Sequence, residues 1–509
     1  MLPFLNVAAK NSKKYVVAFN GINYSEAYTE GDFSDSKNIS TAQFPCVTTR
    51  FGREEVGAYS APTTLHTKDG LMVIDGTDAI YNGTVVGSVT AGRKQMATVG
   101  NYIIIFPDKV YYNVETKKFG SMEASASASG LVFTDSTITT TGDDFPFQVG
   151  DAITISGCTV HPENDKTVEK AIIIRGVDKK VLTFYENSFT AGTETGAVTL
   201  KRDVPDLDFI CESNYRLWGT KGNTIYSSKF MDPMNFNVFD GITSDSYAIS
   251  VGSDGEFTGC APFSSHICFF KENTLHKLYG SKPSNFQIVT SQVYGVQAGS
   301  ERSICIINET LFYKGVGGVY AYTGGVPELV SAKFGVRKFS EACAATDGSR
   351  YYISMREGAV WHTFVYDVQR NLWVEEDDAH CVDMSFHDGH VYFLTADGKL
   401  LKVDETADRS NVEWSVTFCP FNETVNERKG YSKFHMRLEL AAGSWLKVEE
   451  KRAVDTDWRQ IYSTHNERAR TLSIPVIPSR CDSVTIRLSG KGECLLRTFI
   501  REFFTGSDV

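Results

Sequence analysis

The sequence predicts an all-β fold. Of its 509 residues, 42 are glycine and 12% are aromatic, and short apolar runs such as residues 102–106 and 391–394 stand between turn-forming residues. This combination is typical of strands joined by tight turns, and no long amphipathic helical stretch accompanies it. With 42% hydrophobic and 22% charged residues the chain is globular, and its length indicates two to four domains.

A unit in which a polar turn feeds an apolar strand recurs along the chain. Successive copies lie about 30 to 50 residues apart, except for one gap that is about 80 residues too long. The copies start at Gly70, Tyr102, Arg216, His266, Thr310, Arg350 and His390. The usual spacing is close to the length of a four-stranded propeller blade, so the pattern predicts a β-propeller with one large insertion.

Hairpin turns inside these units support the same interpretation. The dipeptides Asp75-Gly76, Lys221-Gly222, Gly317-Gly318 and Asp397-Gly398 tolerate the positive φ that tight hairpins need. We therefore predict a propeller of about seven blades, formed by residues 1–123 and 203–405. The stretch around residues 15–50 is the candidate for completing the last blade.

Residues 124–202 form the predicted insertion. It opens with SMEASASASG, whose small residues are typical of a linker, and continues with short β-patterned runs. In one of them, Ile153 and Ile155 lie on the same face of a strand. The economical fold for these strands is a small β-barrel module.

Residues 406–509 show longer alternating strands. In KFHMRLEL the apolar Phe434, Met436, Leu438 and Leu440 alternate with polar residues, so one face is predicted buried and the other wet. Six or seven such strands in about a hundred residues predict a C-terminal β-sandwich.

The net charge of −11 is concentrated in residues 1–405, because basic and acidic residues nearly balance in residues 406–509. An acidic body argues against ordinary nucleic-acid binding, which requires cationic groups to neutralise phosphates. Solubility alone is the simpler explanation of the charge.

The cysteine spacing and the first ten residues are evidence on the cellular compartment of the protein. Eleven cysteines stand singly with no CxxC pair, which predicts reduced, mostly buried thiols; a zinc site or a disulfide framework is the weaker alternative. Residues 1–10 lack the pattern of a secretory signal, so we expect synthesis and retention in a cytoplasm. No run approaches the roughly 18 apolar residues of a spanning helix, so no membrane insertion is expected.

Reactive motifs are not found in the sequence. There is no GxSxG elbow, HExxH helix, Walker loop or GxGxxG fingerprint, and the glycines at 315, 317 and 318 lack the Lys-Ser/Thr pair of a phosphate loop and predict a hairpin turn. We predict no catalytic, cofactor-binding or metal site, no cofactor, and a protein that is not an enzyme.

Several residues are nevertheless candidates for catalysis, metal binding or sugar binding. The acids at 375–378 could serve a glycosidase, although four consecutive acids are more typical of a solvated loop. His380, His387 and His390 could place two metal ligands on one hairpin, but exposed polar positions explain them as well. The six tryptophans could stack on sugars, whereas core packing is the simpler role.

Several segments carry a family resemblance. They are NYRLWGTKGNTIYSSKFMDPMNF, FFKENTLHKLYGSKPSNFQIV, TLFYKGVGGVYAYTGGVPELVS, FPFQVGDAITISG, RLELAAGSWLKVEE, SIPVIPSRCDSVTIRLSGKGEC and REFFTGSDV. Together they resemble virion tail proteins of tailed bacteriophages of the β-propeller type, and the nearest architecture is the tail nozzle (tail tubular protein B-like) of short-tailed phages.

The resemblance implies a structural subunit in the virion tail, synthesised in the bacterial host cytoplasm. It implies a homohexameric ring that lines the DNA exit channel and contacts neighbouring tail proteins, such as the adaptor below the portal and the tail fibres. Genomic DNA would pass without specific binding. The alternative function is a baseplate or fibre-like module that binds or cleaves host surface glycans. A kelch-like cytoplasmic scaffold is weaker, because the blades lack a paired-glycine signature and carry unlike insertions.

Overall fold

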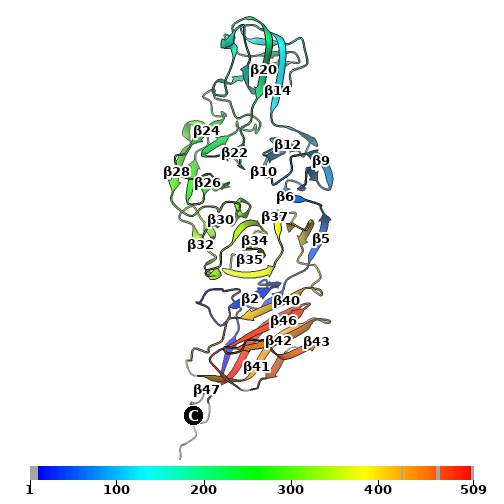
Figure 1. Cartoon of the computed structure of the whole chain (residues 1–509), viewed down its shortest axis with the longest axis vertical. Helices are drawn as coiled ribbons and strands as arrows, with labels where there is room; N and C mark the ends of the chain where they lie inside the picture. Colours follow the sequence, from blue (N-terminus) through cyan, green and yellow to red (C-terminus); the bar gives the residue numbers. More distant parts are fainter. Residues whose placement is uncertain (1–9, 426–427, 466–470, 478, 506–509) are drawn as a thin grey trace, which may run out of the picture. The chain divides into compact units, whose positions relative to one another are not determined.

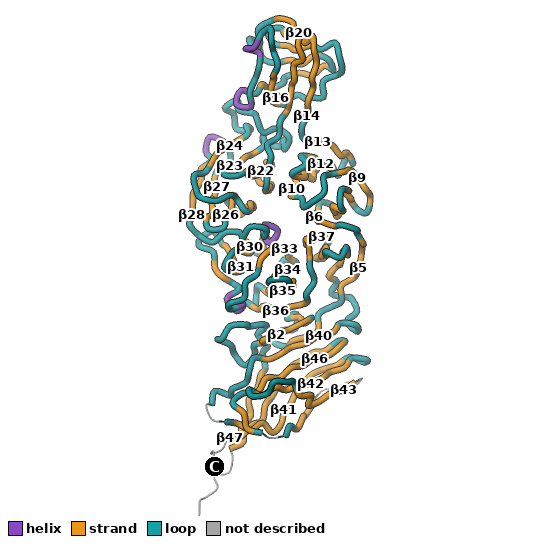
Figure 2. Tube along the Cα trace, viewed as in Figure 1, coloured by secondary structure: helices purple, strands orange, loops and turns teal. Residues whose placement is uncertain are grey.

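The computed structural model describes residues 10–425, 428–465, 471–477 and 479–505. The chain divides into two compact units, one of residues 60–301 and one of residues 1–59 with 302–509. Strands and loops make up almost all of the described chain (Figures 1 and 2). The helical segments within these described ranges are five single 3-10 turns: η1 (Pro162–Asn164), η2 (Val168–Lys170), η3 (Pro283–Asn285), η4 (Glu301–Ser303) and η5 (Ala332–Phe334). The predicted all-β class is confirmed.

The unit of residues 60–301 contains four antiparallel sheets, each of four strands in chain order. The first two are β6 (Pro62–Thr67), β7 (Leu71–Asp75), β8 (Asp78–Tyr81), β9 (Thr84–Ser88), and β10 (Gln95–Val99), β11 (Tyr102–Phe106), β12 (Val110–Asn113), β13 (Lys118–Ser121). The other two are β21 (Phe209–Ser213), β22 (Arg216–Lys221), β23 (Thr224–Ser227), β24 (Tyr247–Ser250), and β25 (Gly259–Phe263), β26 (His266–Lys271), β27 (Thr274–Tyr279), β28 (Gln287–Ser291). Neighbouring sheets share apolar cores, such as the cluster that joins Trp218 and Ile225 to Phe269 and Leu278.

The same unit holds a seven-stranded sheet within the range predicted for the insertion. Its order is β17 (Ile172–Ile173), β16 (Ala152–Ser156), β20 (Gly192–Arg202), β14 (Ala124–Phe133), β15 (Thr137–Thr139), β19 (Val181–Thr183), β18 (Gly176–Asp178). The prediction of a linker at SMEASASASG is wrong, because this stretch runs into β14, which pairs along its length with β20. The alanines at 124, 126 and 128 pack on the apolar cluster of this sheet while the intervening serines are exposed, so the small residues follow strand alternation.

The unit of residues 1–59 and 302–509 contains three more four-stranded sheets. They are β29 (Cys305–Ile307), β30 (Thr310–Gly315), β31 (Gly318–Tyr322), β32 (Glu328–Leu329); β33 (Ser340–Thr346), β34 (Arg350–Glu357), β35 (Val360–Asp367), β36 (Leu372–Asp377); and β37 (Cys381–His387), β38 (His390–Thr395), β39 (Lys399–Val403), β5 (Arg53–Ala58). An N-terminal strand thus completes the last sheet, but it is β5 and not the predicted stretch around residues 15–50. The sequence REEVGA of β5 has one large apolar residue and lies on an edge, so it lacks the alternation that marks a strand.

Two further sheets in this unit combine the N-terminal strands with residues 413–505. One contains β3 (Ile39–Ser40), β4 (Val47–Thr49), β47 (Cys494–Thr505), β41 (Lys429–Leu440) and β44 (Thr471–Pro475), with β1 (Lys10–Val16) on β47 and β45 (Arg480–Cys481) on β41. The other contains β2 (Phe33–Lys37), β40 (Glu413–Phe418), β46 (Val484–Lys491), β42 (Trp445–Arg452) and β43 (Arg459–His465). Phe434, Met436, Leu438 and Leu440 are buried in the core that both sheets share, which confirms the predicted alternation of this strand.

Candidate binding pocket

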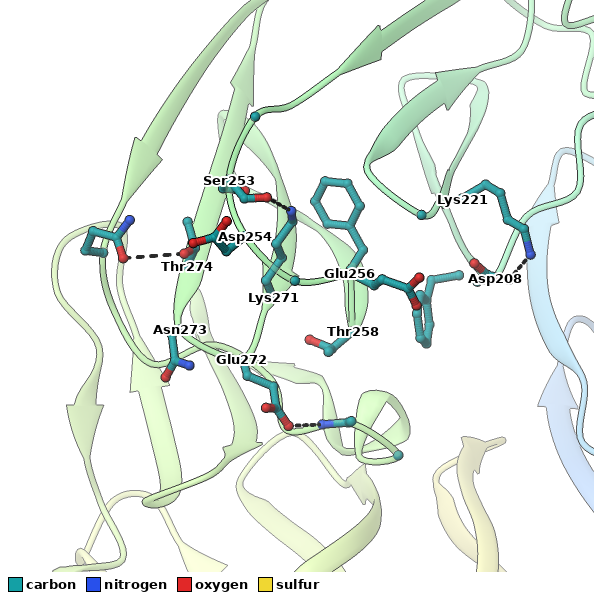
Figure 3. Close-up of a pocket in the computed structure, with 18 residues that line it drawn as sticks. Asp208, Lys221, Ser253, Asp254, Glu256, Thr258, Lys271, Glu272, Asn273 and Thr274 are labelled. Atoms are coloured by element: carbon teal, nitrogen blue, oxygen red, sulfur yellow. Dashed lines mark hydrogen bonds and ion pairs between the residues drawn. The ribbon is translucent and has the colours of Figure 1, made fainter.

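A cavity of about 1150 Å³ lies at one end of the neighbouring sheets β21–β24 and β25–β28 (Figure 3). Five separate segments line it: the start of β21, the β22–β23 turn, the loop of residues 252–258, the β26–β27 turn with the residues beside it, and positions 292, 298 and 299 after β28. All of them belong to the unit of residues 60–301. The cavity is therefore built by loops that two rigid sheets hold in place.

Tight turns bring these segments together. Gly222 adopts φ +54° in the β22–β23 turn and Gly255 adopts φ +76° in the loop, a region that favours glycine. The Val251 amide donates to the Asn223 carbonyl at 2.9 Å, and the Thr258 hydroxyl donates to the Val296 carbonyl at 2.7 Å. These bonds fix the loop at both ends.

Lys271, at the end of β26, is the buried cation of the pocket. Its side chain reaches Ser253 (Figure 3), and the residue is 1% exposed. Its Nζ donates to Asn223 Oδ1 at 2.6 Å and to the Ser253 carbonyl at 2.7 Å, and it lies 5.1 Å from the centroid of the Phe257 ring. Burial lowers the pKa of Lys271, and the charge of Asp254 only partly opposes that shift.

Carboxylates outnumber ammonium groups in the lining. Asp208, Asp254, Glu256 and Glu272 face two lysines, Lys271 and Lys221. Asp208 is paired with Lys221 at 2.8 Å, and Glu272 accepts from the Ala298 amide at 3.1 Å. The lining therefore carries a net charge of about −2 when all six groups are ionised.

Three of the polar side chains have no partner within the described part of the chain. The carboxylates of Asp254 and Glu256 accept no hydrogen bond and form no ion pair there, and the amide of Asn273 makes no hydrogen bond. All three residues are exposed. Their hydrogen-bonding capacity is available to solvent or to a ligand.

His276 lies behind the loop on β27 and is held in its neutral form. Burial, assisted by the charge of Lys271, lowers its pKa to about 4. Its Nε2 contacts the Ser253 hydroxyl at 2.8 Å and its Nδ1 contacts the Thr290 hydroxyl at 2.9 Å. Nε2 thus anchors the loop, and Nδ1 ties the ring to the neighbouring strand β28.

The run of acids at 375–378 lies elsewhere, and its interpretation as a solvated loop is wrong. Glu375 and Glu376 are buried on β36, and of the four acids only Asp378 is exposed. Arg53 binds Glu376 at 2.6 Å and Asp377 at 2.8 Å. The counter-charges come from the N-terminal segment, more than 300 residues away in sequence, so no local pattern indicated them.

Further contacts complete this acidic strand. Glu375 accepts from the Tyr24 hydroxyl at 2.7 Å and contacts His362 Nδ1 at 2.8 Å. Burial opposes ionisation of Asp377, but the charges of Arg53 and Arg50 outweigh it and hold the pKa of Asp377 below its usual value. The carboxylates of Glu375, Glu376 and Asp377 are therefore all engaged by groups of the protein itself and are not available to a substrate.

The remaining candidates take structural positions. His387 and His390 face each other across the β37–β38 hairpin, whereas His380 stacks on Trp361 with ring centroids 3.9 Å apart. Among the described residues no group of three or more His, Cys, Asp or Glu could hold a metal ion. The eleven cysteines are free thiols and nine of them are buried.

The tryptophans were expected in the core, and the glycines at 315, 317 and 318 were expected in a hairpin turn. Trp218, Trp373 and Trp414 are buried, and the other three are half-buried. Gly315 and Gly318 face each other at the β30–β31 hairpin, as predicted for a turn.

The sequence did not reveal the pocket. Of the lining residues, the sequence analysis singled out Lys221 and Gly222, and it identified them only as a hairpin turn. The one available signal was the run GSDGE at 252–256, a glycine-rich acidic loop between two predicted blades.

Comparisons with known proteins do not assign a family. No protein-family profile and no curated protein matches the sequence. Among solved structures, the exo-β-1,3-galactanase from Phanerochaete chrysosporium is 8% identical with a TM-score of 0.23, and the match covers 56% of this chain and 92% of that one. The extracellular domain of a hybrid two-component system from B. thetaiotaomicron is 11% identical with a TM-score of 0.37, covering 89% and 60%. Both scores are too low to support an argument about fold or function.

The described residues include no helix long and apolar enough to cross a membrane.

Proposed function

We propose that this protein is a structural subunit of a bacteriophage tail and forms the ring-shaped nozzle around the DNA exit channel. One observation carries the proposal: seven four-stranded antiparallel sheets follow one another in the chain, and an N-terminal strand completes the seventh. Sheets of this size in succession, with the last one shared between the two ends of the repeat, are the arrangement of propeller blades. In this proposal the seven sheets are the blades of one β-propeller.

The other sheets take the remaining parts of the proposed architecture. In this proposal the seven-stranded sheet of residues 124–202 is the small β-barrel module, and the two sheets that share the core of Phe434 and Phe499 are the β-sandwich. A propeller needs neither part for its own closure. They are therefore the proposed contact surfaces towards other copies and towards neighbouring tail proteins, the adaptor and the tail fibres.

The charge fits a channel through which DNA passes without specific binding. The net charge is −11, and an acidic lumen repels phosphates, so the DNA slides without adhering. The protein acts structurally and carries out no catalysis in this role. A basic lumen in an assembled ring contradicts this part of the proposal.

Two measurements test the function. Mass spectrometry of purified virions is expected to identify the chain, and negative-stain microscopy of the concentrated protein is expected to show closed rings. Absence from virions, or a protein that remains monomeric at every concentration, overturns the proposal.

Deletion of residues 124–202 tests the contact role of the insertion. Ala124 and Arg202 are opposite each other in the β14–β20 ladder, so a short Gly/Ser linker can rejoin the chain at this point. We expect a folded β-rich protein that no longer enters rings or virions. Normal rings contradict the contact role, and global unfolding shows that the insertion is part of the core.

A further inference from the structure

We propose that the pocket between β21–β24 and β25–β28 binds a neutral saccharide through its hydroxyl groups. The proposal does not depend on the ring function. It starts from Asp254, Glu256 and Asn273, whose exposed polar groups have no partner among the described residues. Two acceptors and an amide that both donates and accepts are the groups that bind vicinal hydroxyls, because each hydroxyl can donate and accept.

Lys271 adds a fixed positive charge beside the pocket lining. An ammonium group has three N–H bonds, and Asn223 and Ser253 accept two of them. Because the side chain is buried against Phe257, the ammonium cannot move to seek other partners. The buried ammonium therefore acts on a ligand through its charge and not through a direct hydrogen bond.

The charge of the pocket selects against anions. Four carboxylates face two lysines, and one of these, Lys221, is already paired with Asp208. Phosphate, sulfate and uronic acid groups are repelled by the unpaired Asp254 and Glu256. A polyamine can pair with the carboxylates, but its ammonium groups have no acceptor for the N–H groups of Asn273. An uncharged polyol can donate hydrogen bonds to the carboxylates and accept them from the amide of Asn273.

The walls leave room for a sugar ring. A Cβ added at Gly222, Gly252 or Gly255 would meet no atom within 4 Å, so the backbone itself borders the open space. The cavity of about 1150 Å³ is slightly larger than the usual range of small-molecule sites, which is about 300 to 1,000 Å³. Phe209 and Phe257 add apolar surface to this polar lining.

Gly252 provides a way to fill the pocket. Its backbone lies outside the positive-φ region, so a larger residue can be introduced there without backbone strain. Gly252→Trp would place an indole in the cavity. Gly325→Trp is the matched control, because Gly325 also borders open space without positive φ and does not line the pocket.

The experiment uses the full chain on a printed array of neutral and acidic glycans, followed by calorimetric titration with the best neutral oligosaccharide. We expect saturable binding that falls at least tenfold in Gly252→Trp and in the double variant Asp254→Asn/Glu256→Gln. Gly325→Trp is expected to bind within twofold of the natural chain. If Gly252→Trp fails to fold, the near-isosteric double variant decides the outcome.

Several results overturn the proposal. They are failure of every neutral glycan on the array to bind, a preference for sulfated or uronic acid glycans, and unchanged affinity in folded Gly252→Trp or in the double variant. Competition by spermidine with no binding of neutral glycans would show a cation site instead. None of these results bears on ring formation, which is scored separately by microscopy.

Discussion

Two acid-rich segments of this protein use the same residue types in opposite ways. On β36, Glu375, Glu376 and Asp377 are engaged by Tyr24, His362, Arg50 and Arg53. In the loop of residues 252–258, Asp254 and Glu256 are exposed and unpaired within the described chain. The number of acids in a run is therefore no guide to its role; the presence of counter-charges decides it.

The physical basis of the difference is solvation. A buried carboxylate must be paired, because its desolvation is not otherwise compensated. An exposed one keeps its water at little cost and can exchange that water for a ligand. The paired strand is thus expected to govern stability, and the unpaired loop is expected to govern binding.

The largest expected effect comes from Trp218, which lies on β22 in one of the two sheets that carry the pocket. Trp218 is 2% exposed and Trp373 is fully buried, and Trp218 packs against Tyr247, Phe269 and Phe286. Trp218→Ala is expected to cost about 3 to 5 kcal/mol of unfolding free energy, as for other buried aromatics. Denaturant unfolding measures it. A melting temperature lowered by less than a degree contradicts the prediction.

Replacing a buried cation tests whether the acids on β36 depend more on their partners for stability than the acids around the pocket do. Arg53→Met removes the guanidinium closest to Glu376 and Asp377, leaves Arg50 in place, and is expected to cost about 3 kcal/mol. Lys221→Met breaks the half-exposed pair with Asp208 and is expected to cost less than about 1 kcal/mol. Denaturant unfolding measures the loss of unfolding free energy in each variant. Equal losses would contradict the prediction that the buried pair contributes more to stability than the exposed pair.

Lowering the pH should reduce the contribution that Asp377 on β36 makes to the unfolding free energy. The pKa of Asp377 is lower in the folded state than in the unfolded state, where it is about 3.9, so the unfolded state binds more protons as the pH falls below about 5. Its contribution to stability is complete above that pH and is lost as the pH falls through the folded pKa. Unfolding measured between pH 7 and pH 3 should show the natural chain losing more stability than Asp377→Asn. Parallel losses would exclude Asp377 as a contributor.

The smallest effect on stability is expected in the loop. Asp254→Asn and Glu256→Gln remove charges that have no partner in the described chain, so each should change the unfolding free energy by no more than about 0.5 kcal/mol. The same calorimetric or denaturant measurement applies. A loss as large as that of Arg53→Met would show that these acids are structural.

Local patterns predicted local structure well. The run at 102–106 is β11, the glycines at 76, 222, 318 and 398 have positive φ as the turns require, and the alternation in residues 433–440 matches the burial of β41. Each of these features depends on residues close in sequence. Strand period and turn chemistry are sufficient to identify them.

Features that depend on distant partners were missed. The acids on β36 looked like a solvated loop because Arg50 and Arg53 are more than 300 residues away. The strand β5 was overlooked because REEVGA carries no alternation, and the pocket because five segments contribute to it. Each of these errors arises where a long-range contact overrides a local signal.

The pairing of the N-terminal strands has a consequence for how the protein is made. β5 finds its partner, β39, roughly 340 residues later, and β1 pairs with β47, whose partner residues extend to Thr505. At about 5 to 20 residues per second, a ribosome needs tens of seconds to deliver those partners. During that time β1, β2 and β5 lack their native partner strands, and their sheets can form only after residues 399–505 have been made. These three strands are therefore synthesised well before the strands that complete their sheets.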